Sequence, residues 1–212
     1  MKVLLFGATG HIGSAIAAEL LSRGHQVTGV TRSGSNGDDA GFPLVAGDVS
    51  NAAQVAELAA GHDLVASAVG PRLGVDDDRE ILIGATNGLI EGLRKSGVKR
   101  LVVLGGAGSL ETAPGVRVID SPHFPEMWKA NAHAQIEALG IYREVQDLDW
   151  TFISPAQMIE PGERTGSYRV GGEQLLVDAE GKSRISIADY AIAFVDEIER
   201  GASIRTRIAV AY

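Results

Sequence analysis

The 212-residue chain contains no cysteine, so disulfide bonds, thiolate metal sites and cysteine nucleophiles are excluded. It also has no long basic segment, and 19 Lys and Arg against 27 Asp and Glu give a net charge of −8. An acidic chain lacks the concentrated positive surface that phosphate backbones require, which argues against a nucleic-acid partner. No apolar run approaches a membrane span, and the N-terminal apolar run is too short for a signal peptide. These absences predict a cytoplasmic protein with no membrane partner.

Short apolar runs alternate with segments of helical length along most of the chain. The runs are KVLLF (2–6), QVTGVT (26–31), PLVAG (43–47), DLVASAV (63–69), RLVVLGG (100–106) and WTFIS (150–154). Strands that alternate with helices form a parallel sheet covered on both faces. The sequence therefore predicts an α/β fold, a doubly wound Rossmann sheet in three α/β/α layers.

The alternation of apolar strands and helices ends after Pro155. Pro161-Gly162 and Gly171-Gly172 are turn signals around a short strand, SYRV, so residues 155–186 are predicted to form a polar excursion or hairpin. Ser186 and Asp189 have the spacing of a capping box at the start of a final helix, and RTRIAVA returns as a last strand. We expect a single domain over residues 1–212, in which residues 155–186 contribute a small substrate lobe.

Two helices are predicted between the later strands. One extends over 76–97 and carries Gly84, Gly88 and Gly92 on one face, which we expect to pack on the sheet, with a helix-paired homodimer as the alternative. The other extends over 127–148, from its apolar stripe. The oligomeric state, monomer or homodimer, stays open.

The strongest motif lies between the first strand and the first helix, in GATGHIG. Glycines at 7, 10 and 13 allow a tight turn and a close approach of backbone amides to a ligand. A dinucleotide diphosphate rests on the helix N-terminus at this place in Rossmann folds. The alternative is a turn that only packs helix against strand. The predicted contacts are Gly7, Ala8, Thr9, Gly10, His11, Ile12 and Gly13, with His11 contributing its backbone N–H.

The end of the second strand indicates which dinucleotide binds. An NAD site places an acidic residue there to hold the ribose 2′-hydroxyl, but this strand ends in Thr31-Arg32 with no acid before Asp38. Arg32 would bind a 2′-phosphate by charge-assisted hydrogen bonds, so NADP(H) is the predicted cofactor and NAD(H) an alternative. The alternative is that Arg32 is an ordinary solvated arginine.

Two further strand ends complete the predicted cofactor site. Asp48, followed by Val49, would accept the adenine amino group, unless it only helps to start the next helix. The small residues Ala68, Val69 and Gly70 would let the adenosine ribose lie close to the fourth strand.

GATGHIG, VTR, GDV, SAVG, VVLGGAGSL, LDWTFISPA and TGSYRV together resemble the atypical short-chain dehydrogenase/reductases. The resemblance covers essentially the whole chain. Within this family, the chain is most similar to the NmrA-like, NADH-flavin reductase-like and biliverdin reductase B-like groups. It implies a sheet order of 3-2-1-4-5-6 with a seventh strand. It also implies that Ser154, Pro155 and Ala156 line the nicotinamide, that Ser109 is the active-site serine, and that Gln157 is a pocket residue. For Ser109 a turn role, and for Gln157 a solvated loop amide, are equally good interpretations.

One departure from ordinary short-chain dehydrogenases bears on the reaction. Their Tyr-x-x-x-Lys pair is missing, and Pro125 precedes Lys129 by four residues. Alcohol–ketone interconversion through that pair is therefore not expected, whereas hydride transfer to a small planar acceptor such as a flavin or quinone needs mainly proximity and orientation. A non-catalytic NADP(H) sensor and an epimerase- or dehydratase-like enzyme remain alternatives. Lys129, His133 and His123 are read as solvated, and no cluster has metal-ligand spacing.

Overall fold

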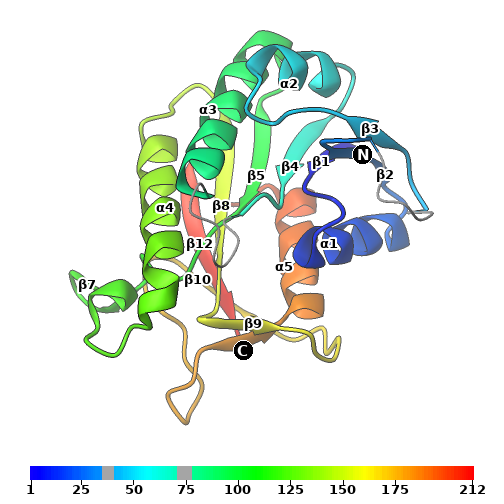
Figure 1. The fold of residues 1–212 in the computed structure, drawn as a ribbon. Helices are drawn as coiled ribbons and strands as arrows, with labels where there is room; N and C mark the ends of the chain where they lie inside the picture. The colour runs from blue at the N-terminus through cyan, green and yellow to red at the C-terminus, as the bar shows by residue number, and fades with distance from the viewer. Residues whose placement is uncertain (35–40, 71–77) are drawn as a thin grey trace.

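In the computed structural model, residues 1–34, 41–70 and 78–212 are described. A single eight-stranded sheet has the order β10-β12-β8-β5-β4-β1-β2-β3, with helices on both faces (Figure 1). The strands are β1 (Lys2–Phe6), β2 (Gln26–Thr31), β3 (Leu44–Ala46), β4 (Leu64–Ser67), β5 (Arg100–Leu104), β8 (Asp149–Pro155), β10 (Arg169–Gly171) and β12 (Thr206–Ala211).

Seven of these strands are parallel, and their order confirms the expected 3-2-1-4-5-6 arrangement, with β8 sixth and β12 as the seventh strand. The eighth, β10, is antiparallel to β12. The prediction that the SYRV strand belongs to a separate hairpin is therefore wrong. Its last two residues are part of β10, which is the edge strand of the main sheet.

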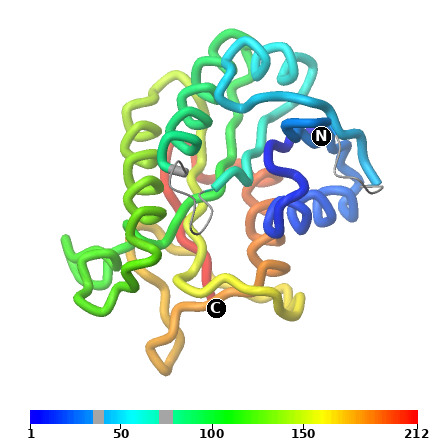
Figure 2. The backbone as a smooth tube through the Cα atoms, in the orientation of Figure 1, coloured from blue at the N-terminus to red at the C-terminus, as the bar shows by residue number. Residues whose placement is uncertain are grey.

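Each sheet face has its own apolar core. The helices α1 (His11–Ser22) and α5 (Ile187–Arg200) pack on each other and cover one face; α2 (Ala52–Ala59), α3 (Asp78–Ser96) and α4 (Glu126–Arg143) cover the other. Figure 2 follows the chain through these layers. Parallel strands need such covering on both sides, and their near-continuous apolar sequences reflect it.

The glycine face of α3, predicted to pack on the sheet, packs on α2 and the loop before it. A Cβ on Gly88 would stand 2.2 Å from the Val49 carbonyl oxygen, and one on Gly92 would stand 2.5 Å from the Val55 side chain. These contacts belong to α2 and the loop before it, so the expectation that this face packs on the sheet is wrong. The same contacts cover the face within the chain, which leaves it unavailable for pairing helices between two copies.

The helix α4 ends earlier than its apolar stripe predicts. It stops at Arg143, and the buried Val145 and Leu148 lie in the connection to β8. Tertiary packing of that connection continues the apolar pattern beyond the helix. Between β5 and α4, the short β6 (Glu111–Ala113), β7 (Val116–Arg117) and the 3₁₀ turn η1 (Val118–Asp120) form a projecting insertion.

Residues 155–186 form what we call the arm. It contains β9 (Met158–Glu160), β10 and β11 (Arg184–Ser186), and β9 pairs with β11 in a small parallel sheet below the main one (Figure 1). The predicted cap at α5 is half present: Ser186 Oγ accepts the Asp189 N–H at 3.0 Å. The Asp189 carboxylate instead accepts hydrogen bonds from the arm and from Tyr212.

Candidate functional site

The glycine loop after β1 is held by direct backbone packing. Gly7 has φ +74°, and a Cβ there would lie 3.0 Å from the Ala68 carbonyl carbon. A Cβ on Gly13 would lie only 1.9 Å from the Gly7 carbonyl oxygen. Real Cβ atoms essentially never approach as closely as the 1.9 Å at Gly13, and the positive φ of Gly7 strains any residue with a side chain, so both positions favour glycine.

Gly10 is different, because its surroundings are open. The nearest heavy atom to a Cβ at Gly10 would be 3.5 Å away, and its φ of −74° suits any residue. Gly10 is the N-cap of α1, where no side chain caps the helix and no acidic residue occupies the first turn. An uncapped N-terminus beside an exposed glycine leaves amides and a positive dipole end for an anion. The loop therefore fits a dinucleotide diphosphate.

The other predicted loop residues lie around this opening with different exposures. Ala8 is buried, Ile12 is half-buried, and Thr9 and His11 are exposed. On the adjacent strand, Ala68, Val69 and Gly70 follow β4 directly, and the first two contact Gly7. The structure thus brings the β1 and β4 groups of predicted residues together at the carboxyl edge of the sheet.

Arg32 and Asp48 lie side by side because their strands pair, Thr31 opposite Ala46. The Arg32 side chain is exposed. Hydrogen bonds from the Ser50 hydroxyl, at 2.7 Å, and from the Ser50 backbone N–H lower the pKa of Asp48, and the positive charge of Arg32 adds to this effect. These bonds order the turn before α2, which Asn51 caps. The backbone of Val49 packs against α3 at Gly88.

The residues at the end of β8 are enclosed. Ser154 is fully buried, Pro155 is buried, and Ala156 is 3% exposed. The Ser154 Oγ has no hydrogen-bond partner among the described residues.

The two candidate catalytic residues lie in different surroundings. Ser109 is half-buried, and its Oγ accepts a hydrogen bond from Arg207 Nη1 at 3.0 Å. Arg207 is itself buried on β12 and pairs with Glu173. Gln157 has an exposed side chain, and its backbone N–H donates to Ser183 Oγ at 3.2 Å. Ser109 is thus held by a buried cation, whereas the Gln157 amide faces solvent.

Two of the lysine and histidine side chains considered earlier lie along α4. Lys129 pairs with Glu126 at 2.7 Å, one turn before it on the helix, and the His133 side chain is exposed. His123, on the loop ahead of the helix, is exposed as well. These positions suit solvated side chains.

Sequence reasoning missed a groove between the glycine loop and the arm. It has a volume of about 380 Å³ and is open to solvent. One wall comes from the first turn of α1, a second from the arm and a third from the first turn of α5; the lining residues are His11, Ser14, Ala15, Pro161, Gly162, Ile187 and Ala188. His11 and Pro161 are far apart in sequence, so no local pattern could have indicated the groove.

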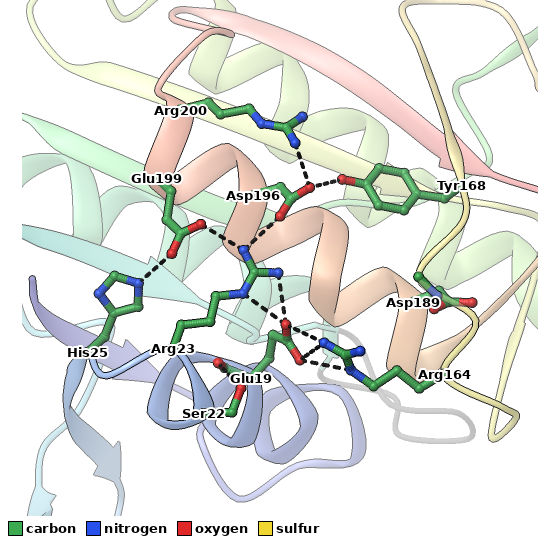
Figure 3. Close-up of polar contacts among 11 residues, drawn as sticks. Glu19, Ser22, Arg23, His25, Arg164, Tyr168, Asp189, Asp196, Glu199 and Arg200 are labelled. Atoms are coloured by element: carbon green, nitrogen blue, oxygen red, sulfur yellow. Dashed lines mark hydrogen bonds and ion pairs between the residues drawn. The ribbon is translucent and has the colours of Figure 1, made fainter.

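Charged contacts fasten the arm to α1 and α5 (Figure 3). Arg164 on the arm reaches Glu19 on α1 at 2.9 Å, and Glu19 also binds Arg23 at 2.8 Å. Burial alone would raise the pKa of Glu19, but the hydrogen bonds and charges of these two arginines outweigh it and lower the pKa.

A second layer of the same network connects α1 and the arm to α5. Arg23 reaches Asp196 at 2.7 Å, and Tyr168 donates a hydrogen bond to that carboxylate. Burial and the adjacent Asp196 raise the pKa of Tyr168 to about 12. The buried Asp189 accepts bonds from the Thr165 hydroxyl and the Gly166 N–H, which outweigh burial and lower its pKa. The arm, which forms one wall of the groove, is thus held to α1 and α5 by several hydrogen bonds and ion pairs.

A family model for NAD(P)H-binding proteins matches residues 7–198, so the chain belongs to this NAD(P)H-binding family of atypical short-chain dehydrogenase/reductases. The family includes oxidoreductases, and NAD(P)H is its cofactor class.

Three relatives cover nearly the whole chain. YwnB of Bacillus subtilis, of uncharacterized function, is 38% identical over 94% of this chain and 92% of its own length. A Burkholderia pseudomallei structure, whose name describes it as an exported protein, is 50% identical with a TM-score of 0.92 over 100% of both chains. SP1627 of Streptococcus pneumoniae, whose name assigns it to the NADH-flavin reductases, is 35% identical with a TM-score of 0.88, over 100% of this chain and 99% of its own.

Two further kinds of site are absent from the described residues. Within that part of the chain, no helix combines the length and apolarity needed to cross a bilayer. No cluster of three or more histidine, aspartate or glutamate side chains suited to a metal ion occurs there either.

Proposed function

We propose that the protein is an NADPH-dependent oxidoreductase that transfers a hydride to a small planar acceptor such as a flavin or quinone. The observation that carries the proposal is the open Gly10 cradle at the uncapped start of α1, with Arg32 exposed at the end of β2. A cation rather than a carboxylate at the latter place favours a 2′-phosphate.

The chain's own residues would hold the cofactor at three places. The amides around Gly10 bind the diphosphate, Arg32 binds the 2′-phosphate, and the small residues after β4 let the sugar lie against the backbone. When bound, the reduced cofactor supplies a hydride and leaves as NADP⁺. The acceptor gains that hydride and one proton from water, so no protein acid is required.

The environment of α4 supports an acceptor that needs no protein acid or base. Lys129 has Pro125 four residues before it and is paired with Glu126, so this helix offers no tyrosine–lysine pair at that position. A conjugated acceptor delocalises the negative charge that it receives, which makes orientation the main requirement. The groove beside His11 supports an acceptor site between the glycine loop and the arm.

The test is NADPH oxidation by the purified protein with FMN, riboflavin and simple quinones as acceptors. We expect turnover with at least one planar acceptor and none with secondary alcohols or ketones. Tight nucleotide binding without oxidation by any of these acceptors would instead indicate a redox sensor. Conversion of a nucleotide sugar would indicate an epimerase, and either result would overturn the proposal.

A further inference from the structure

We propose that Gln135 binds the nicotinamide half of the cofactor, as a positioning residue that the family motifs do not indicate. The proposal rests on the cofactor assignment above and deepens it. Gln135 lies on α4, the helix on which Lys129 has proline instead of tyrosine four residues before it, and it faces the sheet.

The Gln135 side chain is buried without a full set of partners. It is 7% exposed, and its Oε1 has no hydrogen-bond partner among the residues that the structure describes. A buried amide oxygen left unpaired costs about 1–3 kcal/mol. Buried polar groups are almost always satisfied in folded proteins, so this oxygen calls for a donor beyond those that the described residues supply.

Glycines leave the Gln135 amide within reach of the sheet's carboxyl edge. A Cβ on Gly106, just after β5, would lie 3.0 Å from Gln135 Cβ and Cγ. A Cβ on Gly70, just after β4, would lie 3.8 Å from Gln135 Nε2. Side chains at these two strand ends would stand in front of the amide, and both positions are glycine.

The location assigns the donor to one half of the dinucleotide. A Rossmann fold binds one mononucleotide with its first three strands and the other with its second half, across the point where the strand order reverses. Arg32, at the end of β2, marks the adenosine side through its proposed contact with the 2′-phosphate. Gly70 and Gly106 follow β4 and β5, in the second half, where the nicotinamide carboxamide and its ribose hydroxyls carry hydrogen-bond donors.

A structural water is the competing explanation. Gln135 lines an internal cavity of about 10 Å³ together with Ser67, Thr86 and Tyr142. That volume holds about one water molecule, which could satisfy Oε1 in place of the cofactor. The two explanations differ in what a substitution of the amide does to binding.

The deciding variant is Gln135→Met, which keeps a side chain of similar length against Gly106 but removes the amide. Gln146→Met is the matched control, because Gln146 is exposed and lies after the end of α4. For both variants and the wild type, calorimetry measures affinity for NADP⁺ and for 2′,5′-ADP, which lacks the nicotinamide half. Thermal unfolding is measured without nucleotide.

We expect Gln135→Met to weaken NADP⁺ binding about three- to tenfold, with unchanged 2′,5′-ADP binding and an unfolding temperature equal to or above that of the wild type. Gln146→Met should change none of these quantities. Unchanged NADP⁺ affinity, equal losses for both ligands, or a lower unfolding temperature with intact NADP⁺ affinity would overturn the proposal in favour of a structural amide.

A NADP⁺ analogue with an acetyl group in place of the carboxamide identifies the donor. If the carboxamide is the partner, Gln135→Met loses no further affinity for this analogue; if a ribose hydroxyl is the partner, the loss persists. A wild type that binds NADP⁺ but reduces no acceptor would refute the proposed reaction and leave the role of Gln135 standing.

Discussion

The glycine loop and the arm face each other across the groove, and they are built in opposite ways. The loop depends on contacts between near neighbours and on the adjacent strand end, with Gly13 against Gly7 and Gly7 against Ala68. The arm depends on contacts across the whole chain, such as Arg164 with Glu19, 145 residues away. Backbone packing fixes the first region and side-chain charge the second, so the two should respond to different perturbations.

The largest expected effect comes from Gly13→Ala. Its Cβ would overlap the Gly7 carbonyl oxygen at 1.9 Å, so strand and helix must separate. We expect a loss of about 3 kcal/mol or more in the free energy of unfolding, measured by denaturant titration. Gly10→Ala is the control, because its nearest contact is 3.5 Å. It should cost at most about 1 kcal/mol, because alanine is a poorer N-cap than glycine, and it should weaken NADP⁺ binding. Equal destabilisation by both variants would contradict the distinction.

The next effect concerns the arm. Glu19→Gln leaves Arg23 and Arg164 without their shared carboxylate, whose side chain is 8% exposed. Because the Arg164 side chain is 59% exposed, the expected loss is about 1–3 kcal/mol, below that of a fully buried pair. In the exposed pair of Arg79 with Glu137, Glu137→Gln should cost at most about 0.5 kcal/mol.

The Glu19 contribution also has a defined pH dependence. A carboxyl whose pKa is lowered by folding stabilises the protein above its unfolded pKa, and this contribution is lost as the pH falls through the folded pKa. The stability difference between wild type and Glu19→Gln should therefore be constant at neutral pH and shrink below about pH 4.5. A difference that persisted into strong acid would show that packing rather than charge holds the arm.

A smaller effect is expected on the adenine side of the loop. Arg32→Ala should weaken NADPH binding about tenfold or more while changing NADH binding little, because only NADPH carries the 2′-phosphate. Fluorescence titration with the two nucleotides measures the ratio. Equal losses of affinity for NADPH and NADH would show that Arg32 does not bind the 2′-phosphate.

The smallest effect is expected from Ser109→Ala. It should lower turnover with a planar acceptor and leave nucleotide affinity nearly intact, with about 1 kcal/mol of stability lost with the Arg207 hydrogen bond. Steady-state kinetics and thermal unfolding separate the two effects. A variant with wild-type turnover would leave Ser109 with a structural role alone.

The alternation of strands and helices, the glycine loop and the final helix could be predicted from the sequence because each is encoded by adjacent residues, whereas the sheet order came from the resemblance to a known family. The groove, the partners of Asp189 and the place of β10 could not, because they depend on residues from distant segments. The glycine face of α3 shows an intermediate case: the pattern indicated close packing, but only the structure identified α2 as the partner. Gln135 gave no signal, since an inward amide looks like any polar residue until its surroundings are known.

The antiparallel strand β10 has a consequence for how far the chain can be shortened. Its pairing with β12 occupies main-chain groups that would otherwise border open solvent. In a variant lacking the arm, β12 and its buried apolar residues would become an exposed edge strand. Such a strand can pair with the edge strand of another copy. Removal of the arm would therefore produce aggregates rather than a minimal nucleotide-binding unit.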